Sequence, residues 1–168
     1  MTIRVSNSTH RIEMFGFVGR VIITHVITYV GAGVLFSVVL GEYTNAYSSP
    51  AVSAYIRPTT DPLLAYSPLL QLVRGAVIAI ALLPLRTVLI DRRWGWTVLF
   101  GVLVALQQFA APGGVIEALI YTKLPISFQL LNVPEVVLQL FVFSVVIWFW
   151  ERRLSSRRSS RVTPISRR

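Results

Sequence analysis

The chain has 168 residues, of which 54% are hydrophobic and 14% are charged, and its formal net charge is +9. Soluble domains carry about 25% charged residues, so this composition excludes an ordinary soluble fold and predicts a protein surrounded largely by lipid. There is no cysteine and there are only two histidines, His10 and His25, which excludes disulfides, thiolate catalysis and cysteine-based metal sites.

Four apolar stretches are long enough to cross a membrane, since a spanning helix needs about 20 mostly apolar residues. Backbone N–H and C=O groups must be satisfied within each segment in lipid, so we expect each stretch to be helical. The sequence therefore predicts an all-α integral membrane protein with one four-helix transmembrane domain over residues 1–150. The predicted spans cover about residues 17–40, 68–90, 96–111 and 133–150.

The connections between the predicted spans differ in kind. Residues 91–95 form a short turn, so spans two and three are expected to form an antiparallel hairpin. Span three is followed by Pro112-Gly113-Gly114, which predicts a helix break. The apolar stretch 115–121 then predicts a short interfacial helix between spans three and four.

Basic residues indicate the orientation in the membrane. Thirteen of the sixteen precede or begin span one, flank the 91–95 turn, or follow span four. The positive-inside rule then predicts a multi-pass protein of the cell inner membrane with both termini in the cytoplasm. An interfacial aromatic belt is expected at the same face, from Trp94, Trp96, Trp148 and Trp150.

The C-terminal segment, residues 151–168, is a basic tail with seven arginines and one acidic residue. It has little apolar surface to bury, so we expect it to be disordered. Beyond setting the orientation, it is suited to contact anionic lipids or an acidic partner protein. Nucleic acid is not an expected partner, because no aromatic residues interleave with the basic ones. The residues proposed for these contacts are Arg152, Arg153, Arg157, Arg158 and Arg161.

A few polar residues within or beside the spans form a candidate site, because ionisable groups at membrane depth are energetically expensive. We predict an outer-leaflet polar cluster centred on an Arg74–Glu135 or Arg74–Glu117 ion pair. The structural alternatives are that Arg74 extends to the headgroups and that Asn132 and Glu135 form a capping box. The full candidate cluster is Arg74, Gln107, Gln108, Glu117 and Glu135.

His25 lies in the inner half of the first span. A buried histidine is expected to bond a neighbouring hydroxyl or carbonyl, although a single axial ligand for a haem or chlorophyll is the alternative. The sequence does not determine whether any cofactor is bound, and it predicts no metal site.

No catalytic motif is present, so no catalytic residue is proposed. The leading hypothesis is a non-catalytic accessory or scaffold subunit that binds other membrane subunits or copies of itself. One alternative is a small transporter or channel that uses the outer-leaflet polar cluster. A second alternative is a lipid-modifying enzyme at the outer interface, using Glu117 in the segment 115–121.

Overall fold

A computed structural model of the chain describes residues 7–39, 41, 49–55, 57, 61–110, 114–116, 122–123 and 125–162. Every element in these ranges is helical, which confirms the all-α prediction for the described part of the chain. The elements are α1 (Asn7–Val39), α3 (Pro50–Ser53), η1 (Pro62–Tyr66), α4 (Ser67–Leu82), η2 (Leu83–Leu85), α5 (Arg86–Asp91), α6 (Gly95–Val104), η3 (Ala105–Ala110, a π-helical turn) and α8 (Ile126–Val162).

Three segments are helical and apolar over a length that can cross a membrane: Ile12–Val38, Ser67–Leu89 and Ile126–Arg157. They correspond to the first, second and fourth predicted spans. The third predicted span is apolar and helical over Gly95–Phe109, but this is shorter than the roughly 20 residues that a spanning helix needs. A fourth span therefore stays a prediction.

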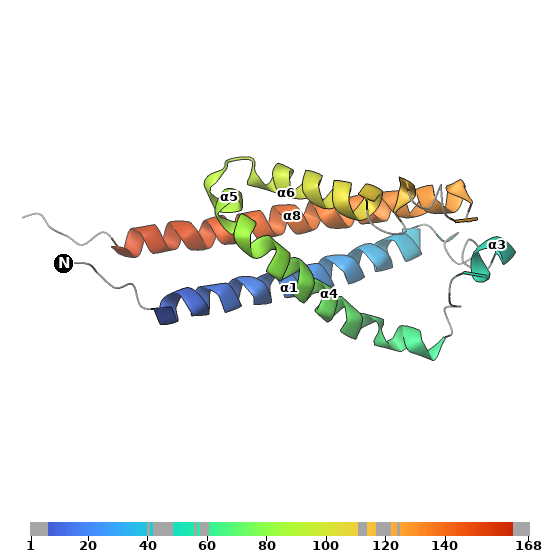
Figure 1. The fold of residues 1–168 in the computed structure, drawn as a ribbon, viewed down its shortest axis with the longest axis horizontal. Helices are drawn as coiled ribbons and strands as arrows, with labels where there is room; N and C mark the ends of the chain where they lie inside the picture. The colour runs from blue at the N-terminus through green and yellow to red at the C-terminus, as the bar shows by residue number, and fades with distance from the viewer. Residues whose placement is uncertain are drawn as a thin grey trace, which may run out of the picture.

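The long helices alternate in direction, so that α1 begins and α8 ends at the same end of the molecule, while α3 lies at the opposite end (Figure 1). We call these the terminal end and the α3 end. Helix α1 packs against α4 and α8, and α6 packs against α8. The second span continues through α5, which packs against α6 and α8, so the helices enclose one common core.

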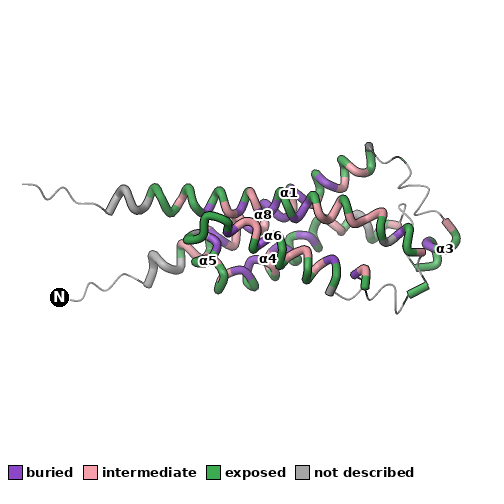
Figure 2. The backbone as a smooth tube through the Cα atoms, turned by 90° about the horizontal axis from the view of Figure 1, so that it is seen from above, coloured by how far each residue is buried: buried purple, intermediate pink, exposed green. Residues whose placement is uncertain are grey.

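The hydrophobic core lies toward the terminal end, where α1, α4, α5, α6 and α8 all contribute apolar side chains. Buried residues concentrate along the inner faces of the helices (Figure 2). In a lipid surrounding, such side chains stabilise helix packing mainly through van der Waals contact with one another. The core consists of Phe17, Val21, Ala79, Leu82, Leu89, Leu99, Phe143 and Ile147.

The second span is one helical segment with a tightened middle. Proline cannot donate a backbone hydrogen bond, and at Pro84 the α-helix gives way to the 3₁₀ turn η2 before α5 resumes. The predicted hairpin follows, because α5 and α6 pack together across the 92–94 turn. A side chain at Gly95 would collide with the carbonyl oxygen of Leu89, so this close turn requires glycine.

The helix that contains the fourth predicted span begins before residue 133. Helix α8 begins at Ile126 and contains Pro134, so Asn132 lies inside the helix and is not its N-cap. Its side-chain nitrogen donates to the carbonyl oxygen of Phe128 at 3.1 Å, one turn earlier. Proline is tolerated inside membrane helices because surrounding groups satisfy the backbone carbonyl that it leaves free. The capping-box interpretation of Glu135 therefore fails.

Residues 151–162 of the tail are helical in the structure, because α8 continues to Val162, and the disorder of the tail stays a prediction. The arginine side chains pack back onto aromatic rings of the preceding turn. The guanidinium of Arg152 lies 5.0 Å from the ring centre of Trp148, and that of Arg153 lies 5.2 Å from the ring centre of Phe149. Through these cation–π contacts, Arg152 and Arg153 cover part of the aromatic surface of α8. The composition of the tail alone does not indicate such contacts.

The predicted interfacial helix at 115–121 falls mostly outside the described residues. Only residues 115–116 of it are described, and both are helical.

Candidate functional site

Four of the five residues of the predicted outer-leaflet cluster are described, and the cluster itself stays a prediction. Arg74 lies exposed on α4, and the ion pairs among the described residues include none between Arg74 and Glu135. Glu135 is instead directed toward α1, since its Oε1 lies 3.5 Å from the position that a Cβ on Gly33 would take. Gln107 is half-buried and Gln108 is buried within η3. Glu117 lies outside the described residues.

The structure brings together a different set of charges, at the terminal end of the molecule. Glu151 on α8 is almost fully buried, with 1% of its side chain exposed. Its Oε1 accepts a hydrogen bond of 2.6 Å from Nε of Arg20 on α1, and its Oε2 accepts one of 2.8 Å from Nε of Arg86 on α5. A second nitrogen of the Arg20 guanidinium also contacts Oε1. One carboxylate thus joins three helices.

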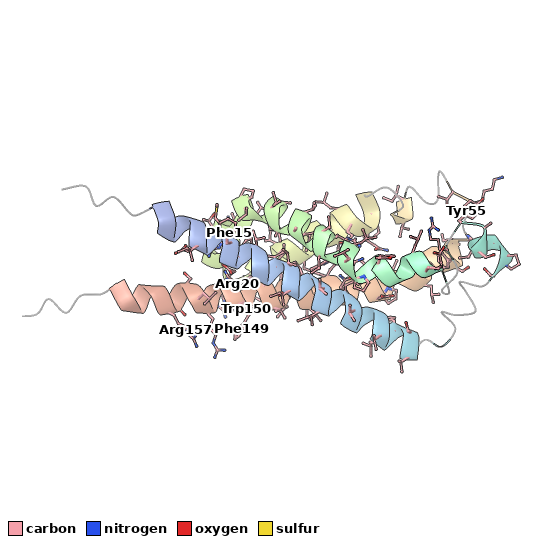
Figure 3. All side chains as sticks on the ribbon, turned by 90° about the horizontal axis from the view of Figure 1, so that it is seen from below. Phe15, Arg20, Tyr55, Phe149, Trp150 and Arg157 are labelled. Carbon is pink, nitrogen blue, oxygen red and sulfur yellow. The ribbon has the colours of Figure 1, made fainter. Side chains whose placement is uncertain are left out.

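The surroundings of Arg86 extend this charge centre. Its Nη1 lies 3.9 Å from Oε2 of Glu13, and its guanidinium lies 5.4 Å from the ring centre of Phe17. Figure 3 shows Arg20 of α1 beside the part of α8 that carries Phe149 and Trp150. We refer to Glu13, Arg20, Arg86 and Glu151 as the charge centre.

The geometry of the charge centre favours holding helices together over reacting with a substrate. Both carboxylate oxygens of Glu151 accept hydrogen bonds from guanidinium groups, so the group is poorly placed to bind a further cation. Breaking a buried ion pair by removing one partner is strongly destabilising, because the remaining charge is left uncompensated. The expected consequence is a rigid junction of α1, α5 and α8.

Sequence reasoning assigned Arg20 and Arg86 to the orientation signal and Glu151 to the tail. One signal could have found the centre: Glu151 is the single acidic residue of the tail and directly follows the last apolar span. Arg20 lies near the start of span one and Arg86 near the end of span two. In an antiparallel bundle these three positions share one membrane face.

His25 is buried and takes part in a polar contact between helices. Its Nε2 lies 3.2 Å from Oε1 of Gln71 on α4, and its ring stands edge-on to Phe143, with ring centres 6.3 Å apart. The backbones approach closely nearby, since a Cβ on Gly75 would lie 3.1 Å from the Cα of Ile22. These contacts favour a packing and hydrogen-bonding role for His25, whose partner is the side-chain carbonyl oxygen of Gln71. The same Nε2 is the atom that an axial ligand of a haem would use.

A groove of about 230 Å³ lies between α1 and α8, beyond His25 toward the α3 end. It contains one polar group without a partner among the described residues, Nε2 of the buried Gln139. Two further buried hydroxyls on the same helices, of Thr24 and Ser144, likewise have no described hydrogen-bond partner. The groove is lined by Ile27, Thr28, Gly31, Ala32, Leu35, Leu138, Gln139 and Val142.

Comparisons with protein-family models, with curated proteins and with solved structures find no match to this chain. The functional argument therefore depends on the helices and side chains described above.

Proposed function

We propose that the protein is a non-catalytic accessory or scaffold subunit of an inner-membrane assembly, either with other membrane subunits or as a homo-oligomer. In this proposal both termini lie in the cytoplasm, as the basic residues predict. The observation that carries the proposal is the surface of α4. This helix buries one stripe against the bundle, and most of its other side chains stay exposed. The buried stripe consists of Gln71, Gly75, Ala79 and Leu82.

The exposed side of α4 combines apolar residues with one charge. Val73 and Val77 are exposed there, and Arg74 lies between them within the membrane-length segment Ser67–Leu89. An arginine on a lipid-facing surface is costly unless its head reaches the interface or meets an acidic or carbonyl partner. A neighbouring membrane helix that supplies such a partner would cover the apolar surface and satisfy Arg74 together.

The test is native mass spectrometry of tagged protein purified from its own membranes in mild detergent. We expect a stoichiometric second subunit or a second copy with the wild-type protein. The Arg74→Gln variant should lose most of this association, whereas Arg93→Gln, which removes an exposed arginine in the α5–α6 turn, should keep it. A thermal melt of each variant shows that the fold survives. Wild-type protein that elutes as a monomer with lipid alone would overturn the proposal.

A small transporter is the second candidate, and the α1–α8 groove is the observation that favours it. The groove offers the unpartnered amide of Gln139, and Glu135 lies one turn away on the same helix. Solute flux in proteoliposomes that is abolished by Gln139→Leu, in a protein that still melts like wild type, would replace the scaffold proposal with this one. The scaffold proposal expects no such flux.

A further inference from the structure

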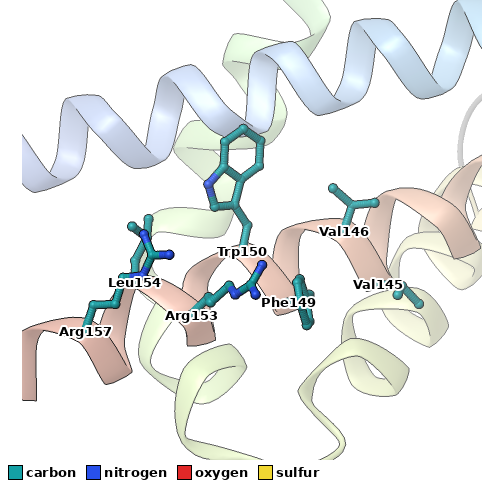
Figure 4. A pocket seen from close by; sticks show the side chains of 7 residues that line it. All are labelled: Val145, Val146, Phe149, Trp150, Arg153, Leu154 and Arg157. Atoms are coloured by element: carbon teal, nitrogen blue, oxygen red, sulfur yellow. The ribbon is translucent and has the colours of Figure 1, made fainter.

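A second groove, of about 430 Å³, lies on α8 near the terminal end. Its volume falls within the roughly 300–1,000 Å³ typical of small-molecule sites. The groove changes character along its length, because the residues nearer the α3 end are apolar and those nearer the end of α8 include two arginines (Figure 4). Its lining consists of Val145, Val146, Phe149, Trp150, Arg153, Leu154 and Arg157.

The helical repeat explains this lining. Residues four apart lie one above another on a helix face, so Val145, Phe149 and Arg153 form one ridge. Val146, Trp150 and Leu154 form the neighbouring ridge, and the Trp150 side chain points from α8 toward α1 (Figure 4). The groove is thus apolar at one end and lined by the guanidinium groups of two arginines at the other.

The position of the groove fits the boundary between hydrocarbon and headgroups. Tryptophan is enriched at this boundary, and Trp148 contacts the α5–α6 turn by donating to the carbonyl oxygen of Arg92 at 3.3 Å. At a rise of 1.5 Å per residue, Arg153 lies about 4.5 Å and Arg157 about 10 Å beyond Trp150 along the helix axis. Phosphate groups of lipids are expected at this depth.

The charge balance favours an anionic ligand. Beyond Trp150 the chain has a single acidic residue, Glu151, and both of its oxygens are engaged by Arg20 and Arg86. The guanidinium of Arg153 lies over the ring of Phe149, 5.2 Å from its centre, and a stacked guanidinium keeps its in-plane N–H donors. Stacked guanidinium groups bind phosphate through such in-plane, bidentate hydrogen bonds.

We propose that this groove binds an anionic phospholipid, with an acyl chain along Val145, Val146 and Phe149 and the phosphate at Arg153 and Arg157. The proposal does not depend on the scaffold function, because it concerns α8 and not the exposed face of α4. In this proposal, Arg153 and Arg157 bind the phosphate of one lipid. The alternative is a general electrostatic attraction between the whole basic tail and anionic headgroups.

The experiment compares the purified full-length protein in nanodiscs of phosphatidylcholine alone and of phosphatidylcholine with phosphatidylglycerol, followed by native mass spectrometry of retained lipid. We expect preferential retention of phosphatidylglycerol by the wild type. The Arg153→Gln/Arg157→Gln variant should bind it about 25-fold more weakly, at about fivefold for each arginine lost near the surface. Val146→Trp, which obstructs the apolar wall without changing charge, should also reduce retention.

The matched control is Arg92→Gln/Arg93→Gln, which removes the same charge from the α5–α6 turn outside the groove. Its lipid retention should equal that of the wild type, and thermal melts confirm that all variants are folded. Equal losses in both double variants would overturn the proposal in favour of general surface charge. Equal retention of both lipids by the wild type would also overturn it, as would complete displacement of the lipid by millimolar inorganic phosphate.

Discussion

Glu151 illustrates how one side chain determines packing in a mostly apolar chain. Taking a carboxylate out of water is costly, and this cost is offset only when its oxygens are well paired. Glu151 meets that condition through Arg20 and Arg86, which approach from two other helices. The charge centre therefore adds geometric specificity to a core whose other contacts are non-directional.

We predict that Glu151→Gln lowers the free energy of unfolding by about 3 kcal/mol, because it leaves two guanidinium groups without their carboxylate. Denaturation in mixed detergent micelles measures this change. The control is Glu13→Gln, whose carboxylate is 28% exposed and lies 3.9 Å from Arg86, and which should cost less than about 1 kcal/mol. Similar losses in the two variants would show that Glu151 has no special role.

At Gly75, the packing of α4 on α1 depends on a close approach of the two backbones. A methyl group there would press on the backbone of Ile22, 3.1 Å away, and backbone cannot move aside as easily as a flexible side chain. We predict that Gly75→Ala destabilises the protein by about 1–3 kcal/mol, the usual cost of overpacking. Thermal unfolding checks this, with Gly19→Ala on α1 as control, since nothing lies within 4 Å of its added Cβ. The prediction fails if the two alanine variants melt alike.

At the scale of elements, a local polar contact marks the start of η1. Asp61 stands directly before this element, at the entry to the second span. Its Oδ1 accepts a hydrogen bond of 2.8 Å from the backbone N–H of Leu63, and its Oδ2 accepts one of 2.9 Å from Arg57. The Leu63 N–H and then the Arg57 guanidinium hold the pKa of Asp61 below its ordinary value.

This depressed pKa predicts how the start of η1 responds to pH. A group whose pKa is lower in the folded state contributes stability above its ordinary pKa and loses that contribution as the pH falls through the folded value. We therefore expect the Leu63 amide to exchange slowly near neutral pH and faster only below the ordinary range of an aspartate. Hydrogen exchange of residues 62–66 measures this response once it is corrected for the intrinsic pH dependence of exchange. In Asp61→Asn, the corrected rate should not vary with pH, and a wild-type profile that is equally flat would contradict the assignment.

At the scale of the whole molecule, the alternating helices place the α5–α6 turn toward the terminal end and α3 at the opposite end (Figure 1). If the bundle crosses the membrane along its long axis, these two sites face opposite compartments. The proposed orientation places the turn in the cytoplasm.

The absence of cysteine from the chain makes this orientation directly testable. We predict that Arg93→Cys, in the turn, reacts with an impermeant maleimide only from the cytoplasmic side of sealed vesicles. Ser53→Cys, in α3, should react only from the opposite side. Labelling of both cysteines from the same side would exclude the proposed topology. Labelling of Arg93→Cys only from outside and of Ser53→Cys only from the cytoplasmic side would show the opposite orientation.

The sequence by itself was sufficient for the all-helical class, the three membrane-length segments and the α5–α6 hairpin, because apolar runs and turn residues act locally along the chain. It was insufficient for the start of α8, where Asn132 and Pro134 resemble a helix start but lie inside the helix. The polar cluster around Arg74 stays a prediction, because it was inferred from depth in the membrane, and depth does not specify which side of a helix a residue occupies. Only the tertiary structure decided the partners of the buried charges: Glu151 is 131 residues from Arg20 and 65 from Arg86. Such pairs depend on how α1, α5 and α8 rotate and approach one another, which the packing of the whole core determines.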